Sequence, residues 1–128
     1  MATKKITFDP NADSSPAANF TILGGANFHG DFEVVTTSNT AFDFTGYSGS
    51  SQMTKSTAIG STSFPAATFV VGFTSAAAGK VRISLGGTQT KLIEEGRYVY
   101  DVIVAAGGTF YTLANGNIYV YNPVSSAP

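Results

Sequence analysis

The chain has a single histidine, and this residue limits the chemistry that the sequence can support. His29 lies in the segment NFHGDF, and Asp31 and Glu33 follow it at alternate positions. On a β-strand these three side chains share one face, so a His-Asp-Glu metal cluster is geometrically possible. Metal sites without cysteine usually use more than one histidine, and hard-cation loops carry more carboxylates. We therefore predict a solvated strand start here, with no metal and no cofactor.

The other candidate catalytic groups lack suitable partners in the sequence. Glu94 and Glu95 are adjacent, so their side chains diverge instead of converging as an acid and a base. The glycines of LGGANFHG, residues 23–30, are not followed by the Lys-Ser/Thr pair and the helix of a phosphate-binding loop. The chain contains no cysteine and offers no visible base for a hydroxyl nucleophile. The sequence therefore predicts a protein that is not an enzyme and has no catalytic residues.

Charged residues are scarce in this sequence. They make up 12% of the 128 residues, with a net charge of −1, so the basic stripe typical of nucleic-acid binding is absent. No segment is apolar for the length of a membrane span, and the N-terminal segment lacks the apolar core of a signal peptide. We therefore expect that the protein binds neither nucleic acid nor a membrane. We also expect that it is synthesised in a cytoplasm. A surface poor in charge fits either a threonine- and serine-covered β-protein or a surface covered by other proteins.

Short apolar runs between turn signals form the elements that must position any functional surface. In KVRISLGG, residues 80–87, Val81, Ile83 and Leu85 alternate with polar residues, as in a strand with one buried face. Paired glycines such as Gly107-Gly108 permit the positive φ angles that tight turns require. Several short strands at this spacing predict a single all-β domain, either a sandwich or a barrel. The best helical candidate is the short stretch 88–95, with Leu92 and Ile93 facing inward.

The two ends of the chain have their own patterns. Residues 1–18 are predicted to form an extended arm, because DPNADSSPAA carries two prolines and no large apolar side chain. Within this arm, the apolar piece 6–8 can add to a sheet edge. Residues 19–128 are predicted to form the β-domain. Near its end, TFYTLANGNIYVY fits either a hairpin at Asn115-Gly116 or, as we favour, one long strand interrupted by a glycine bulge.

Two tyrosines lie two positions apart in EEGRYVYD, residues 94–101. In immunoglobulin-like sandwiches an acidic corner and a small residue precede a tyrosine whose hydroxyl bonds back to the backbone of the corner. Glu95, Gly96 and Tyr98 fit this order, and Tyr100 would fill the volume of the usual core cysteine, burying roughly 150–250 Å². The simpler alternative is that aromatic residues favour strands. The absence of cysteine and tryptophan argues against an antibody-type domain.

The last strands are apolar on both faces. In 96–106, Val99 and Ile103 lie on the face opposite the tyrosines, with Asp101 between them, and in 118–121 aliphatic and tyrosine side chains alternate. Because a sandwich strand needs only one apolar face, we predict that a partner covers the other. The candidate interface residues are Ile6, Phe8, Val99, Ile103, Ile118, Tyr119, Val120 and Tyr121.

Two patches of the sequence match the motifs of a known family. In FDFTGYSGSSQM, residues 42–53, an aspartate-hydrophobic-threonine-glycine-tyrosine turn leads into a strand. In 80–104, Leu92, Gly96, Tyr98, Tyr100 and Asp101 lie at the family spacing. These patches resemble a domain family of tailed-bacteriophage virion proteins, which includes modules akin to the N-terminal domain of upper baseplate proteins. The resemblance spans roughly residues 19–122, although relatives commonly place a basic residue in the strand after Tyr47 and this chain delays it to Lys55.

The resemblance implies both a fold and a role. The implied fold is an immunoglobulin-like β-sandwich of about 7–9 antiparallel strands. The implied role is that of a structural protein of the virion, bound in many copies or as a homo-oligomer to a major capsid, tail or baseplate protein. It would serve as a capsid decoration or as a tail or baseplate component. The alternative is a module that binds a carbohydrate or a host surface, with a glycan stacked on Tyr47, Tyr111, Tyr119 or Tyr121.

Overall fold

The computed structural model describes residues 2–9, 16–55 and 67–121, which form an all-β fold. The all-β prediction is therefore confirmed. Two short helical turns, η1 (Ala76–Ala78) and α1 (Gly87–Thr90), accompany the strands. The strands are β1 (Ala2–Thr7), β2 (Phe20–Leu23), β3 (Phe28–Val35), β4 (Ser48–Lys55), β5 (Ala67–Ser75), β6 (Lys80–Leu85), β7 (Gly96–Ala106) and β8 (Thr109–Tyr121).

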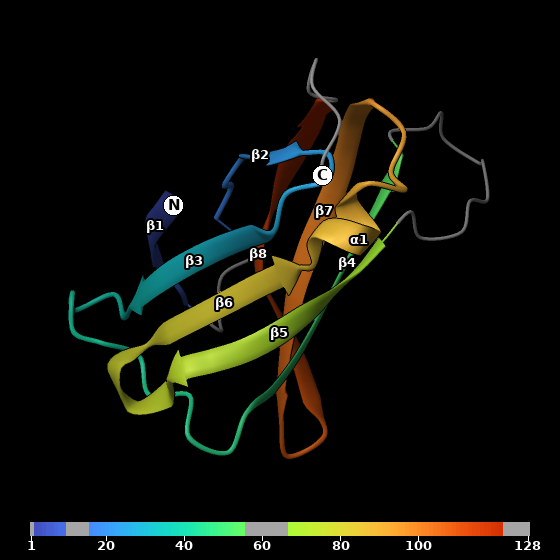
Figure 1. Ribbon diagram of the computed structural model, residues 1–128. Coiled ribbons are helices and arrows are strands. Elements are labelled where there is room, and N and C mark those ends of the chain that lie inside the picture. The colour runs from blue at the N-terminus through green and yellow to red at the C-terminus, as the bar shows by residue number, and fades with distance from the viewer. Residues whose placement is uncertain (1, 10–15, 56–66, 122–128) are drawn as a thin grey trace, which may run out of the picture.

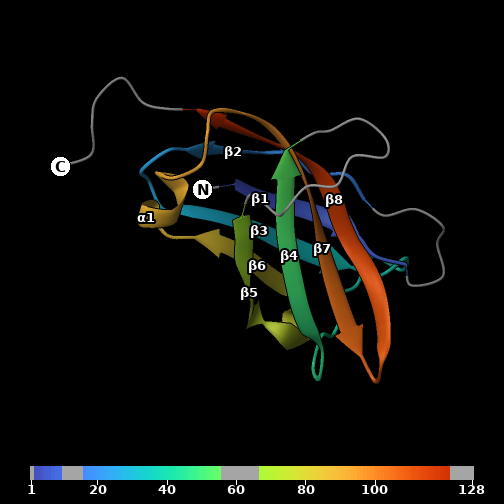
Figure 2. The same ribbon diagram turned by 90° about the vertical axis from the view of Figure 1, so that its right-hand side faces the viewer.

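These eight strands make one continuous, curled sheet in the order β1-β3-β6-β5-β4-β7-β8-β2. Figure 1 shows β3, β6 and β5 as one layer that crosses in front of β4, β7 and β8, and Figure 2 shows the second layer from its outer side. The sheet passes from one layer to the other through β5, which pairs with both β6 and β4. The strand number lies within the predicted range, and the immunoglobulin-like assignment stays a prediction.

The first two strands pair in a direction that the sequence did not predict. β1 runs parallel to β3, with Ile6 opposite Val34, and β2 runs parallel to β8, with Phe20 opposite Ile118. The expectation of purely antiparallel pairing is wrong for these two strands. Parallel neighbours need a crossover connection. The two strands of each pair are separated in sequence by at least one strand of the other layer, so no hairpin sets the direction of β1 or β2.

The predicted arm, residues 1–18, contributes directly to the fold of its own chain. β1 forms one end of the sheet, and the side chains of Ile6 and Phe8 are buried in the core. Ala18 is buried as well, just before β2. Residues 10–15, which carry the first proline of the predicted arm, lie outside the described residues. The apolar piece 6–8 thus packs against the sheet edge within the chain.

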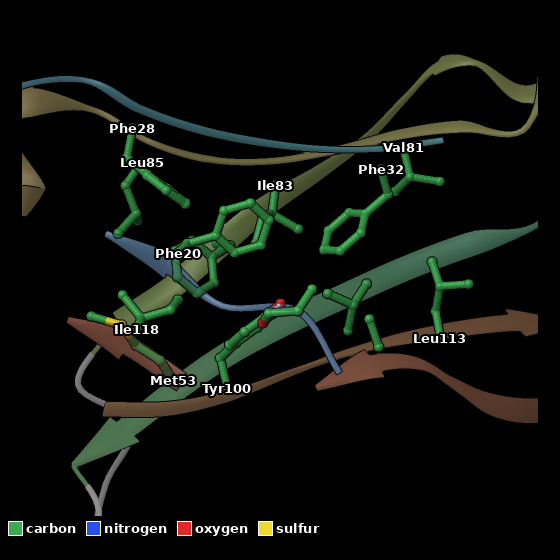
Figure 3. Close-up of a cluster of buried hydrophobic side chains, with 14 of the residues drawn as sticks. Phe20, Phe28, Phe32, Met53, Val81, Ile83, Leu85, Tyr100, Leu113 and Ile118 are labelled. Carbon is green, nitrogen blue, oxygen red and sulfur yellow. Dashed lines mark hydrogen bonds between the residues drawn. The ribbon is translucent and has the colours of Figure 1, made fainter. Parts of the chain in front are cut away.

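The core lies between the two layers and follows from strand alternation. In β3, β6 and β7, alternate side chains are buried, as expected for strands with one face toward a core. Phe20 lies at the centre of the cluster in Figure 3. Its ring makes edge contacts with the rings of Phe28, Phe32 and Tyr100, at centroid distances of 5.7, 5.5 and 5.9 Å. Such edge-to-face pairs add directional preference to the apolar burial.

The helical segment and the last strand show where local pattern was informative. α1 occupies only 87–90, and of the two residues expected to face inward, Ile93 is buried whereas Leu92 is exposed. β8 is a single long strand, as we favoured from the sequence, and it forms a hairpin with β7 through Gly107-Gly108. The predicted glycine bulge at 115–117 is wrong, because these residues pair regularly with β7 and the register shift lies at Leu113 instead. Within the described part of the chain, no helix has the length and apolar character to cross a membrane.

Candidate functional site

An open groove of about 760 Å³ lies on the outer face of the layer formed by β4, β7 and β8. This is the layer that faces the viewer in Figure 2. Uncharged polar side chains predominate among the residues that line it. They are Ala17, Asn19, Gln52, Thr54, Val99, Tyr100, Asp101, Thr112, Asn115, Gly116 and Asn117.

Strand pairing aligns these side chains in rows across the groove. Gln52 of β4 lies opposite Asp101 of β7, which lies opposite Asn115 of β8. The neighbouring row contains Thr54, Val99 and Asn117. Adjacent strands are about 4.8 Å apart, so each row brings residues distant in sequence within reach of one small molecule.

A bulge in β8 decides which of its residues face the groove. The pairing register shifts between Val102 and Ile103, so that Thr112 lies opposite Ile103 while Ala114 lies opposite Val102. The extra residue is Leu113, and both Leu113 and Ala114 are buried. A one-residue insertion changes which face the following side chains occupy. Thr112 and Asn115 therefore both point outward, although their spacing of three would place them on opposite faces of a regular strand.

The segment before β2 forms one wall of the groove. The Ala18 amide donates to the Asn115 carbonyl at 2.8 Å, and the Asn115 amide donates to the Pro16 carbonyl at 3.1 Å. The Asn117 amide donates to Asn19 Oδ1 at 3.0 Å. Gly116 permits this close approach, because a Cβ at this position would collide with the Ala18 carbonyl.

Asp101 is the one ionisable side chain on the polar rows of the groove. Its carboxylate makes no hydrogen bond or ion pair with the residues that the structure describes, whereas its backbone carbonyl accepts a bond from Ser51 Oγ at 2.6 Å. Desolvation by the groove walls raises the pKa of Asp101 above its usual range. The groove therefore presents an acceptor that is partly desolvated and available to a ligand.

The histidine cluster considered from the sequence is not assembled. His29, Asp31 and Glu33 alternate along the outer face of β3, but Asp31 Oδ1 accepts a bond from Arg82 Nε at 2.7 Å. This hydrogen bond is the main reason that the pKa of Arg82 is raised, and the Asp31 charge adds to it. Among residues 2–9, 16–55 and 67–121 there is no group of three histidine or carboxylate side chains placed to hold a metal ion.

Comparison with known proteins identifies a solved structure of similar fold. No family model matches the sequence, and no curated protein does. The fold is similar to that of the N-terminal domain of phage TP901-1 ORF48. The similarity covers 94% of this chain and 98% of that domain, with a TM-score of 0.51 and 12% sequence identity. At this identity the likeness concerns the fold alone.

The first family-like patch forms a compact turn next to the core. Asp43 Oδ1 accepts bonds from the Thr45 amide at 2.9 Å and from Thr45 Oγ1 at 2.6 Å. These bonds, the side-chain one first, lower the pKa of Asp43. Gly46 adopts a φ of 85°, and Tyr47 then packs its ring edge against Phe44 at 5.4 Å. The turn thus presents a structural tyrosine rather than an exposed one.

The second patch contains the geometry expected of a tyrosine corner. The Tyr98 hydroxyl donates to the Glu94 carbonyl, four residues earlier, at 2.6 Å. Tyr100 is buried in the core, where its hydroxyl donates to the Ala18 carbonyl at 2.7 Å. Gly96, which lies between Glu94 and Tyr98, has a φ of 154°, in the range that favours glycine. Glu95 lies exposed at the start of the corner.

The predicted interface residues divide into two groups. Ile6, Phe8, Ile118 and Val120 fill the core of their own chain, so their side chains are not available to a partner. The physical reason is that these four side chains belong to the hydrophobic core between the two layers of the sheet. The outward-facing residues of the prediction are Val99, Ile103, Tyr119 and Tyr121.

The sequence identified Asp101 as an outward residue of a strand but did not identify the groove around it. Gln52 and Asn115 had no distinguishing pattern, because amide side chains are common in strands and turns. The usable signal was a carboxylate within the apolar run YVYDVIV. Such a residue interrupts an otherwise buried strand and marks a polar patch on its outer face.

Proposed function

We propose that this chain is a non-enzymatic structural component of a tailed-phage particle, held in several copies against other virion proteins. The observation that carries the proposal is a fold shared over nearly the full length of both chains with a domain of a phage protein. The motif patches at 42–53 and 80–104 support it independently, because their resemblance rests on the sequence and not on the fold. Their resemblance to upper baseplate modules favours a tail or baseplate position over a capsid decoration.

An exposed apolar end of the molecule suits attachment. Leu23 and Tyr121 are cross-strand partners at the ends of β2 and β8, with exposures of 56% and 49%. Leu92, with 82% exposure, follows α1, which is tied to the same end by the bond from the Gly25 amide to Thr90 Oγ1. We call these three residues the end patch. Isolated exposed apolar residues are ordinary, but a group at one end is typical of a protein contact.

Attachment in many copies relaxes the strength required of each contact. When several domains attach to one particle, binding of the later copies benefits from a high effective concentration. A small apolar patch on each copy is then sufficient for stable assembly. Tyr121 lies on the same outer face of β8 as Asn117, so the end patch adjoins the groove, but none of its three residues lines the groove.

Quantitative mass spectrometry of purified particles tests the structural role. We expect the chain to be present at a fixed stoichiometry in particles of the phage that encodes it, and gold labelling to place it at the tail or baseplate. Labelling of the capsid surface would keep the structural role and correct its position. Absence of the chain from purified particles would refute the proposal.

Co-sedimentation of the recombinant chain with particles that lack it tests the end patch. The double substitution Leu92→Ser and Tyr121→Ser should weaken binding about tenfold or more, because buried apolar anchors dominate such contacts. Phe110→Ser is the matched control, since Phe110 is 74% exposed at the opposite end, in the β7–β8 hairpin. Equal binding by the double variant would exclude the end patch while leaving the structural role intact.

A further inference from the structure

We propose that the groove on β4, β7 and β8 binds a neutral oligosaccharide. The proposal goes beyond the structural role and does not depend on it, because it rests on the residues that line the groove. Sugar recognition requires hydrogen-bonding groups directed at neighbouring hydroxyls and an apolar surface for the C–H faces of the rings. The groove carries both.

The polar requirement is met by the row Gln52, Asp101 and Asn115. A side-chain amide offers a donor and an acceptor at once, so it can accept from one hydroxyl and donate to the next. With strands about 4.8 Å apart, the row is about 10 Å long and suits a short oligosaccharide. Asn117 and Thr54 extend the same chemistry into the adjacent row.

The carboxylate of Asp101 gives the groove its strongest acceptor. It lies between the two amides of its row and has no partner among the described residues. A carboxylate accepts two hydroxyl bonds, and charge-assisted bonds are shorter and stronger than neutral ones. Partial desolvation of an unpaired acceptor costs free energy that a donor ligand offsets on binding. Sugar hydroxyls provide such donors without adding a charge.

The apolar requirement is met beside this row. Val99, 39% exposed, lies in the groove between Thr54 and Asn117. Tyr119 follows Asn117 by two positions, so its ring lies on the same outer face of β8 and is exposed. An exposed tyrosine presents an aromatic face with a polar hydroxyl and can stack on a sugar ring. Tyr47 and Tyr111, by contrast, pack against core aromatic residues.

Other ligand classes fit the groove less well. A nucleic acid or a phosphate group requires cations, and no lysine or arginine lines the groove, whereas Asp101 would repel an anion. A protein partner would be expected to insert an apolar anchor into a desolvated pocket. Aliphatic lining is limited here to Ala17 and Val99. The lining therefore favours a neutral, polyhydroxylated ligand.

Amide chemical shifts measured during separate titrations with maltohexaose, cellohexaose and chitohexaose test this inference. At millimolar concentration at least one probe should give saturable shifts at residues 52, 99, 101, 115 and 117. Asp101→Asn keeps the shape and removes the charge, and Asn115→Ala removes an amide. Each substitution should lower the affinity for the oligosaccharide that binds about tenfold or more. Glu33→Gln is the control, because it removes one exposed carboxylate from the outer face of the other layer.

Three outcomes would overturn the inference. The first is that none of the three oligosaccharides produces saturable shifts in the groove. The second is that the shifts cluster elsewhere, for example at Tyr47 and Tyr111. The third is that Asp101→Asn, with the amide dispersion of a folded protein, binds as the unchanged chain does. None of them bears on the particle-binding experiment, so failure here and failure of the structural role are distinguishable.

Discussion

The Tyr100 hydroxyl donates a 2.7 Å hydrogen bond to the carbonyl of Ala18, which lies 82 residues earlier in the chain. Tyr100 is in the middle of β7, and Ala18 is in the segment that leads into β2. The bond thus joins the centre of the second layer to the wall of the groove. Both residues are buried, so neither group can exchange this partner for water.

Tyr100→Phe should lower the free energy of unfolding by about 1–3 kcal/mol. The ring stays in place, but the buried carbonyl of Ala18 loses its partner and keeps its desolvation cost. Urea unfolding measures the change. Tyr119→Phe is the control, because Tyr119 is exposed, and it should change stability by no more than about 0.5 kcal/mol. Equal effects of the two substitutions would contradict a role for this bond.

Alkaline pH should destabilise the protein through the same residue. Burial raises the pKa of Tyr100 above its ordinary value of 10.0, so the folded chain retains a proton that the unfolded chain releases. The stabilising contribution is therefore complete below about pH 10 and is lost as the pH rises further. Unfolding free energies measured above pH 10 should fall more steeply with pH for the unchanged chain than for Tyr100→Phe. Parallel curves would show that Tyr100 ionises equally in both states.

Gly116→Ala should be strongly destabilising, by about 2–3 kcal/mol. The new methyl group would collide with the Ala18 carbonyl, and the segment 16–19 would have to move away from β8. Gly72→Ala is a matched control, because it also adds a methyl group within a strand but with no atom within 4 Å. Thermal unfolding of both variants compares them. A stable Gly116→Ala protein would show that the groove wall adapts to the methyl group.

Tyr98→Phe should cost about 1 kcal/mol of unfolding free energy. The substitution removes the 2.6 Å bond to the Glu94 carbonyl, which fixes the entry of the chain into β7. Tyr121→Phe tests the specificity of the effect, since Tyr121 is exposed at the end of β8. Hydrogen exchange at the amides of residues 94–98 should also accelerate in Tyr98→Phe and not in the control.

Asp101→Asn should stabilise the fold slightly at neutral pH. Desolvation raises the folded-state pKa of Asp101 above 3.8, so the ionised form costs stability once the pH exceeds that value. The gain is about 0.5 kcal/mol or less, because water screens a largely exposed carboxylate. Urea unfolding at pH 7 and at pH 3 should show the difference between the variant and the unchanged chain disappearing at the lower pH. A loss of stability at pH 7 would show that the carboxylate stabilises the fold.

Much of the local structure was predictable because it depends on neighbours in sequence. The alternation in KVRISLGG placed Val81, Ile83 and Leu85 inside, and their side chains are buried. Gly107-Gly108 predicted the turn between the last two strands. The short helix was predicted too long, because the segment 91–95 forms turns instead and leaves Leu92 in solvent.

The sequence by itself determined which residues form strands and which side of most strands is buried, because apolar and polar residues alternate with a period of two within each strand. Only the tertiary structure decided which strands become neighbours and in which register. Three features depend on contacts between residues far apart in the chain: the parallel pairing of β1 with β3 and of β2 with β8, the bulge at Leu113, and the row of Gln52, Asp101 and Asn115. Such contacts are selected by the packing of the whole core, so no short segment specifies them.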